Sequence, residues 1–168
     1  MTYNSGQSAP YYEQIRQYAA RVTGNWEDAE DVAQETQLRY LSSGKEYQDA
    51  QLRNCLYSIA RNYMIDLFRR KRLLSKITEP SGSAALIYEN LHDAPSPEQA
   101  AQNAEMRVIL REKLNALSSQ TREILHLRYD ESMKSKDIAE ITGLSYGNVR
   151  RILSETIAKL AEEFNAAG

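Results

Sequence analysis

The side chains of this chain best suited to a chemical task are cations that stand close to aromatic and amide groups. Asn62 and Tyr63 precede a run of consecutive arginines and lysine over residues 69–72 by one to three helical turns. Aromatic rings can stack on unpaired bases, and cations beside them can hold the phosphates. The pattern indicates contact with single-stranded nucleic acid, although Tyr63 could be core and a basic run also suits a helix C-terminus. Within this segment we expect Phe68 in the core and the arginines at the nucleic acid.

A second candidate site lies near the C-terminus, where two short amphipathic runs flank the sequence Gly143-Leu-Ser. Gly143 can take the positive φ of a tight turn between helices, and Ser145 is a good N-cap for the second run. The apolar contacts expected between the two runs come from Ile138, Leu144, Val149 and Ile152. This spacing is typical of a helix-turn-helix, whose second helix usually reads the major groove of DNA.

A polar, mainly acidic stripe is the third candidate. Its members stand at i, i+3, i+4 and i+8 and so share one helix face: Asp31, Gln34, Glu35 and Arg39. Such a stripe could dock a basic helix, and a solvated surface is the alternative. The net charge of −2 is unusual for a protein that binds DNA alone, because phosphate contacts dominate that affinity. Separate acidic and basic segments suit one basic partner and one nucleic acid, or simply stabilise helix ends.

Catalysis finds no support in the sequence. There is no phosphate-binding glycine loop and no convincing pair of nucleophile and histidine, so we expect neither an enzyme nor a small-molecule substrate. Cys55 is the only cysteine and is expected to be a small apolar filler; His92 and His126 lie far apart, so no metal site or cofactor is expected. We expect His126 to be partly buried or on the surface of a helix.

No apolar run of about 18 residues and no signal sequence occur, which predicts a cytoplasmic protein without membrane insertion.

The elements that must position these side chains are all predicted to be helical, because apolar residues recur with a period near 3.6 and Gly and Pro are few. Helices are expected over 11–22, from a cap at Asn25 to about residue 40, over 50–72, from Pro97 onward, over 120–130, and in the helix-turn-helix. The fold class is therefore all-α, with two small helical domains over 1–74 and 96–168. A flexible linker over 75–95 joins them and could span roughly 70 Å at about 3.3 Å per residue.

Taken in order, these segments resemble the sigma factors of bacterial RNA polymerase, specifically the extracytoplasmic-function group. The run Thr23-Gly-Asn-Trp-Glu-Asp-Ala-Glu-Asp-Val-Ala-Gln-Glu-Thr is similar to the family's polymerase-binding helix. The run Ile59-Ala-Arg-Asn-Tyr-Met-Ile-Asp-Leu-Phe-Arg-Arg is similar to its promoter-melting and minus-ten-element helix. Leu117-Ser-Ser-Gln-Thr-Arg-Glu-Ile-Leu-His-Leu-Arg-Tyr, with the helix-turn-helix after it, is similar to its fourth conserved region. The run Asp66-Leu-Phe-Arg-Arg also resembles the iron-uptake sigma factors.

The resemblance implies a function and three sets of contact residues. It implies a sigma factor that binds core RNA polymerase, directs it to promoter DNA and helps to open the duplex, and many relatives also bind an anti-sigma factor. Polymerase contact is implied for Asp31, Gln34, Glu35 and Arg39. Minus-ten contact is implied for Lys45, Arg61, Asn62, Tyr63, Arg69, Arg70 and Arg72, with the loop from Lys45 to Asp49 as a base-reading element. Upstream contact is implied for Tyr146, Asn148, Arg150, Arg151 and Ser154.

Three positions depart from the family pattern. Gln37 stands where a large apolar residue is usual, Cys55 where Trp is frequent, and Ile152 where Arg is common in the recognition helix. Glu155 adds a negative charge near that helix. These departures argue against borrowing a promoter consensus from relatives, but not against the binding mode.

Two other interpretations remain open from the sequence. A stand-alone helix-turn-helix regulator would explain the C-terminal part and would leave the acidic helix and the basic helix without a role. A sigma-like protein that acts only through an anti-sigma factor would need no DNA contact, and only Ile152 and Glu155 favour it.

Overall fold

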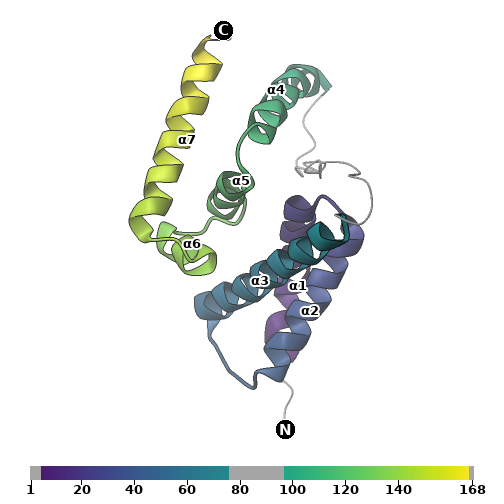
Figure 1. Ribbon diagram of the computed structural model, residues 1–168. Helices are drawn as coiled ribbons and strands as arrows, with labels where there is room; N and C mark the ends of the chain where they lie inside the picture. The colour runs from purple at the N-terminus through teal and green to yellow at the C-terminus, as the bar shows by residue number, and fades with distance from the viewer. Residues whose placement is uncertain (1–4, 76–96, 167–168) are drawn as a thin grey trace.

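The computed structural model describes residues 5–75 and 97–166, and every element in these two ranges is helical (Figure 1). The elements are α1 (Ser5–Thr23), α2 (Trp26–Ser42), α3 (Asp49–Ser75), α4 (Pro97–Asn115), α5 (Ser119–Leu125), the π-helix η1 (His126–Asp130), α6 (Ser135–Thr142) and α7 (Tyr146–Ala166). The all-α fold class is thereby confirmed. The predicted linker over 75–95 lies, apart from its first residue, outside the described residues, so the domain boundaries stay predictions. Within the described ranges, no helix has the length and apolar character needed to cross a bilayer.

Helices α1, α2 and α3 pack into a bundle that carries the N-terminal part of the core (Figure 1). Asn25 caps α2 as predicted, because its side-chain oxygen accepts the backbone N–H groups of Glu27 at 2.8 Å and Asp28 at 3.2 Å. The helix ends differ from the prediction, since α1 begins at Ser5 and α3 continues to Ser75. The apolar period that set the expected bounds stops before the backbone hydrogen bonding does. The buried residues of the bundle include Ile15, Tyr18, Ala19, Ala29, Val32, Ala33, Tyr40, Leu52, Leu56, Tyr57, Ala60 and Met64.

Helices α6 and α7 form the predicted helix-turn-helix. Gly143 ends α6 with φ of 73°, and its N–H donates to the carbonyl of Ala139 at 2.9 Å. Ser145 then begins α7, because its hydroxyl accepts the Asn148 N–H at 3.2 Å. The four predicted apolar contacts are confirmed, with two side chains fully buried and two partly buried: Ile138, Val149, Leu144 and Ile152.

The helix expected over 120–130 changes its hydrogen bonding part-way. After α5 ends, residues 126–130 form a π-helix in which the Glu131 N–H donates to the carbonyl of His126 at 3.2 Å. The expectation of a partly buried or surface His126 was wrong, since its exposed fraction is 4%. It is buried because α1 covers it: the Tyr18 ring stacks on the imidazole with 5.6 Å between centroids.

The C-terminal helices α5 and α6 lie against the N-terminal bundle (Figure 1). The buried apolar residues from Ile15 to Leu153 therefore belong to one core. Helix α6 packs against α3. The Tyr18 hydroxyl of α1 donates to Glu123 of α5 at 2.6 Å, and both side chains are buried. The hydrophobic pattern of the sequence did not indicate this contact between the two halves.

Candidate nucleic-acid interface

The predicted stacking residue Tyr63 lies between two arginines from different helices. The guanidinium of Arg39 on α2 is 5.0 Å from the centroid of the ring, and that of Arg70 on α3 is 5.6 Å away. Both distances fall within the range of cation–π contacts. Arg39 was assigned to the acidic stripe and Arg70 to the basic cluster, so the two candidate surfaces meet at this ring.

The remaining polar and basic residues of the predicted minus-ten surface, apart from Arg61, are exposed on α3 and on the loop before it. Asn62 is exposed one residue before the ring, and Lys45 is exposed on the loop before α3. The Arg69 guanidinium is 3.7 Å from a carboxylate oxygen of Asp66, an exposed pair of small energetic weight. Arg70 and Arg72 are also exposed along this end of the helix.

The prediction that Phe68 belongs to the core was wrong, since its exposed fraction is 39%. It continues the row of Leu56, Ala60 and Met64 at intervals of four residues, and those side chains are fully buried. No described side chain of α3 after Met64 is buried, because the tightly packed part of the bundle ends there. The Phe68 ring is therefore exposed to solvent, as are the basic residues that follow it at 69–72.

Arg61 differs from the rest of the predicted minus-ten set, because it faces the C-terminal half of the chain. Its Nε donates to Oε1 of Glu123 at 2.9 Å, and its side chain is 18% exposed. The structure therefore exposes Asn62 and Arg70, leaves Tyr63 partly buried, and places Arg61 in an interface between helices α3 and α5.

A cavity of about 510 Å³ lies beside the loop that was predicted to read bases. Asp49 ends this loop in a left-handed backbone conformation with φ of 39°. The lining residues come from the loop, the start of α3 and the early part of α1: Pro10, Tyr11, Gln14, Tyr47, Gln48, Asp49 and Leu52. Aromatic and amide groups in such a recess can stack on a base and hydrogen-bond to its edges.

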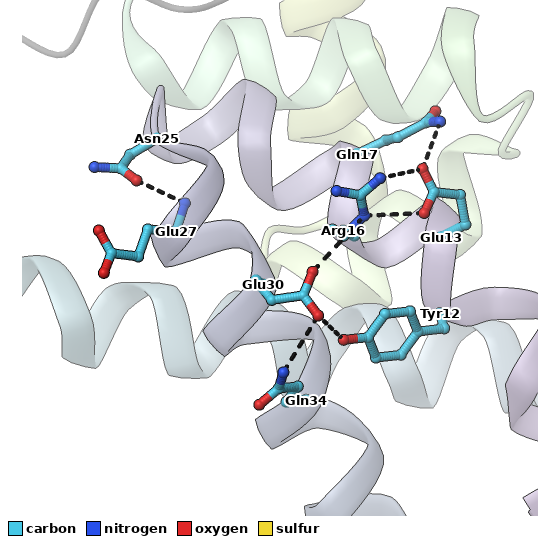
Figure 2. Close-up of polar contacts among 8 residues, drawn as sticks. All are labelled: Tyr12, Glu13, Arg16, Gln17, Asn25, Glu27, Glu30 and Gln34. Carbon is cyan, nitrogen blue, oxygen red and sulfur yellow. Dashed lines mark hydrogen bonds and ion pairs between the residues drawn. The ribbon is translucent and has the colours of Figure 1, made fainter.

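Beside the acidic stripe on α2, Glu30 joins this helix to α1 and contacts one member of the stripe, Gln34, as Figure 2 shows. Glu30 accepts a hydrogen bond from the Tyr12 hydroxyl at 2.5 Å and one from the Gln34 amide at 3.2 Å. The hydrogen bond from Tyr12 lowers the pKa of Glu30, so the carboxylate stays charged. One turn further on, Glu35 and Arg39 form an ion pair at 2.7 Å.

The stripe itself remains open to solvent. Asp31, Gln34 and Arg39 are exposed, and Glu35 is partly exposed. All four predicted members thus lie on one accessible face of α2, where they can meet a partner.

The predicted recognition surface lies on the first three turns of α7. Arg150 sits over the Tyr146 ring with 5.6 Å to the centroid, and both are exposed. Arg151 contacts Asn148 and Glu155, each at 2.7 Å. Ser154 is exposed on the same helix.

The three departures from the family pattern have local contacts. Gln37 donates its amide to the carbonyl of Ser8 at 2.9 Å, which ties α2 to the start of α1. Cys55 is partly buried, and burial raises the pKa of its thiol, as expected for a small filler. Ile152 packs partly buried against the core, so its own side chain contributes to the packing of α7.

Sequence reasoning missed the residues that join the two halves. Tyr18 lies within the helix predicted over 11–22, and a buried tyrosine hydroxyl usually needs a hydrogen-bond partner. The sequence analysis assigned no role to Glu123 and Asn54, and both are buried against the other half of the chain.

Comparisons with known proteins match both halves of the chain. Residues 9–73 match the family described as Sigma-70 region 2, and residues 107–160 match the family described as Sigma-70, region 4. The RNA polymerase sigma factor YlaC of Bacillus subtilis is 30% identical over 146 residues, covering 85% of this chain and 81% of its own. The ferric citrate uptake sigma factor FecI of Escherichia coli is 32% identical over 130 residues, covering 77% and 72%. Because YlaC and FecI are almost equally identical to this chain, the comparison does not single out the iron-uptake subgroup, and membership in that subgroup stays a prediction.

Two solved structures share the fold. The sigma factor RpoE, in complex with the anti-sigma factor NepR from Bartonella quintana, superposes with a TM-score of 0.72 at 18% identity and covers 95% of each chain. CnrH, in complex with the cytosolic domain of CnrY, gives a TM-score of 0.61 at 22% identity and covers 98% of this chain and 89% of its own.

Proposed function

Because the chain belongs to the sigma-70 family of RNA polymerase sigma factors, in its extracytoplasmic-function group, we propose specific roles for its exposed surfaces in promoter-directed transcription initiation. The observation that carries the proposal is the order of two sigma regions, most of whose candidate contact residues are exposed. The site of action is the cytoplasm, where bacterial RNA polymerase meets the chromosome.

The stripe on α2 docks on the core polymerase. Asp31, Gln34, Glu35 and Arg39 present oxygen acceptors and one guanidinium on a single face, which suits a helix rich in basic and polar side chains. The ion pair of Glu35 with Arg39 is exposed, so partner groups can replace it at little cost.

The far end of α3 and the loop before it hold the opened minus-ten strand. The exposed Phe68 offers an aromatic face to unpaired bases, and Tyr63 can do so when Arg39 or Arg70 leaves its ring for a phosphate. Arg69, Arg70, Arg72 and Lys45 neutralise phosphates. The cavity beside Asp49 provides a recess for a base that has left the stack. Asn62 supplies an amide that can hydrogen-bond to a base edge.

The start of α7 reads the upstream element. A helix held by Gly143 and Ser145 presents its N-terminal turns to the major groove, where Arg150 and Arg151 can contact guanine or phosphate. Tyr146, Asn148 and Ser154 complete that surface.

An anti-sigma factor is a further proposed partner. The similar structure of RpoE is a complex with the anti-sigma factor NepR, and that of CnrH is a complex with the cytosolic domain of CnrY.

The experiment that tests these roles measures binding of the purified chain to bacterial core RNA polymerase by fluorescence anisotropy. We expect Asp31→Ala combined with Glu35→Ala to weaken core binding by roughly tenfold or more, as loss of charged interface contacts does. Arg150→Ala should leave core affinity unchanged and weaken binding of the holoenzyme to promoter DNA. Equal losses of core and promoter binding in the Arg150→Ala variant would contradict the assignment.

Absence of any core binding would contradict the polymerase role as a whole. The stand-alone regulator, which needs no polymerase contact, would then be favoured if the chain formed a stable dimer on a palindromic site. Retained DNA contacts through Arg150 and Arg151 would count against a protein that acts only through an anti-sigma factor.

A further inference from the structure

Carboxylates of the C-terminal half face cations and an amide of the N-terminal half along the contact between them. Each of these contacts joins residues far apart in the sequence. We call the set the clasp, and its pairs are Glu123 with Arg61 at 2.9 Å, Asp130 with Arg21 at 2.7 Å, Asp137 with Asn54 at 2.8 Å and with Arg53 at 3.7 Å, and Glu140 with Asn54 at 3.3 Å.

Glu123 is the centre of the clasp. One carboxylate oxygen, Oε1, accepts both the Tyr18 hydroxyl at 2.6 Å and the Nε of Arg61 at 2.9 Å. Glu123 is 9% exposed, so its charge depends on these two donors for compensation. Burial, followed by the charge of Glu123, raises the pKa of Tyr18 well above its usual value, so its hydroxyl keeps the proton that it donates.

The donors that the clasp engages are of the type that binds nucleic acid. A guanidinium recognises a carboxylate and a phosphate through the same charged N–H groups, so one oxyanion can replace the other. Arg61 belongs to the proposed minus-ten set and lies next to the solvent-facing Asn62 on α3, yet its own partner is a buried carboxylate.

We propose that the clasp is an intramolecular competitor of the opened promoter strand, with Glu123 occupying the site on Arg61 that a phosphate takes in the open complex. The inference rests on the proposed role of Arg61 in minus-ten binding and adds its regulation. Full engagement of the strand then requires α5 and α6 to leave α1 and α3.

The surfaces for earlier steps stay accessible while the clasp is closed. Asp31, Gln34 and Arg39 are exposed on α2, as are Arg150 and Arg151 on α7. Core polymerase and upstream DNA can therefore bind the closed chain, and the separation of the two contacts along the duplex would pull the clasp apart. The closed clasp thus weakens the binding of single-stranded DNA by the free chain.

The test compares Glu123→Gln with Glu163→Gln in the full chain. Both changes remove one negative charge from the C-terminal half, but Glu163 pairs with Lys113 of α4 and lies outside the clasp. The probe is a fluorescein-labelled oligothymidylate of about 20 nucleotides, because stacking on aromatic side chains tolerates any base. If the closed form is about 90% populated, Glu123→Gln should tighten binding up to about tenfold, while Glu163→Gln changes it little.

Arg61→Ala in the Glu123→Gln background should remove most of this gain. Small-angle X-ray scattering should show a larger radius of gyration for Glu123→Gln than for Glu163→Gln. Asp137→Asn provides a second route to opening if Glu123→Gln folds poorly, and circular dichroism checks the helix content of each variant.

Unchanged affinity and unchanged radius in both Glu123→Gln and Asp137→Asn would overturn the proposal. Opening without tighter binding, or a gain that survives Arg61→Ala, would overturn the competition for Arg61. Binding to core polymerase tests the proposed function separately, because the stripe on α2 lies outside the clasp. If Glu123→Gln and Asp137→Asn bind core polymerase normally but change neither oligonucleotide affinity nor radius of gyration, the clasp alone is refuted.

Discussion

Arg150 and Arg151 of the recognition helix α7 differ in the intramolecular contacts that DNA would have to replace. Arg151 contacts Glu155 and Asn148, each at 2.7 Å, so its guanidinium is already paired within the helix. Arg150 instead lies over the ring of Tyr146, a contact that leaves its N–H groups able to meet phosphate or guanine. Glu155 therefore weakens the charge that α7 offers to DNA at one position and leaves the other intact.

Replacing Glu155→Gln should strengthen DNA binding by roughly twofold to fivefold, because it removes an exposed ion pair and a carboxylate near the phosphates. The measurement is anisotropy of a labelled random-sequence duplex, since phosphate contacts do not depend on sequence. The gain should shrink as salt is raised, because screening weakens exposed charges. The control is Glu155→Gln in an Arg151→Ala background, where the gain over Arg151→Ala alone should be smaller because no ion pair is released; an equal gain there would mean that Glu155 acts on DNA independently of Arg151.

At the scale of elements, the turn of the helix-turn-helix depends on the backbone of one residue. Gly143 has φ of 73°, and a side-chain carbon added there would meet no atom within 4 Å beyond its chain neighbours, so only the backbone conformation opposes a substitution. Gly143→Ala should lower the free energy of unfolding by about 1 kcal/mol, the usual cost of a left-handed residue with a side chain. Urea denaturation followed by circular dichroism measures this change.

Gly147 offers a matched control within the next helix. It also has open space around it, but it lies in α7 with ordinary helical backbone. Gly147→Ala should therefore raise the free energy of unfolding by up to about 1 kcal/mol. Losses of similar size at both positions would show that the sign of φ does not set the outcome.

Elements with a local chemical signal could be predicted from the sequence. Asn25, Gly143 and Ser145 each satisfy backbone groups within a few residues of themselves, and all three occupy the expected positions. Helix ends without such a signal were placed several residues short. Phe68 was misplaced because its periodicity continues past the end of the packed bundle, and periodicity alone does not show where the covering helices stop.

At the scale of the whole molecule, the contact between the halves escaped prediction for a physical reason. Tyr18 and Glu123 are 105 residues apart, and neither carries a local pattern that depends on the other. The family resemblance assigned Arg61 to minus-ten contact, and nothing in the sequence indicated its carboxylate partner Glu123. The contact between the two halves therefore follows from the three-dimensional packing of helices that are distant in the sequence.

The same contact buries an ionisable group whose charge should make stability depend on pH. Nδ1 of His126 lies 2.5 Å from Asp130, and its Nε2 lies 3.3 Å from Glu131. Burial opposes the charged imidazolium, but the hydrogen bond to Asp130 and the charges of both carboxylates raise the pKa of His126 above its usual value. Arg21 shares Asp130 from the other half at 2.7 Å, and Tyr18 stacks on the ring, so closure of the two halves maintains this environment.

A raised folded-state pKa means that the folded chain binds the proton more tightly than the unfolded chain. The resulting stability is fully present below the unfolded value of about 6.5 and is lost as pH rises through the raised folded value. Urea denaturation at about pH 6 and about pH 8.5 should therefore show a lower free energy of unfolding at the higher pH. In His126→Gln, which cannot titrate, this decrease should shrink. If the wild-type chain and His126→Gln lost stability equally over that window, other titrating groups would account for the effect and the imidazolium would not stabilise the closed chain.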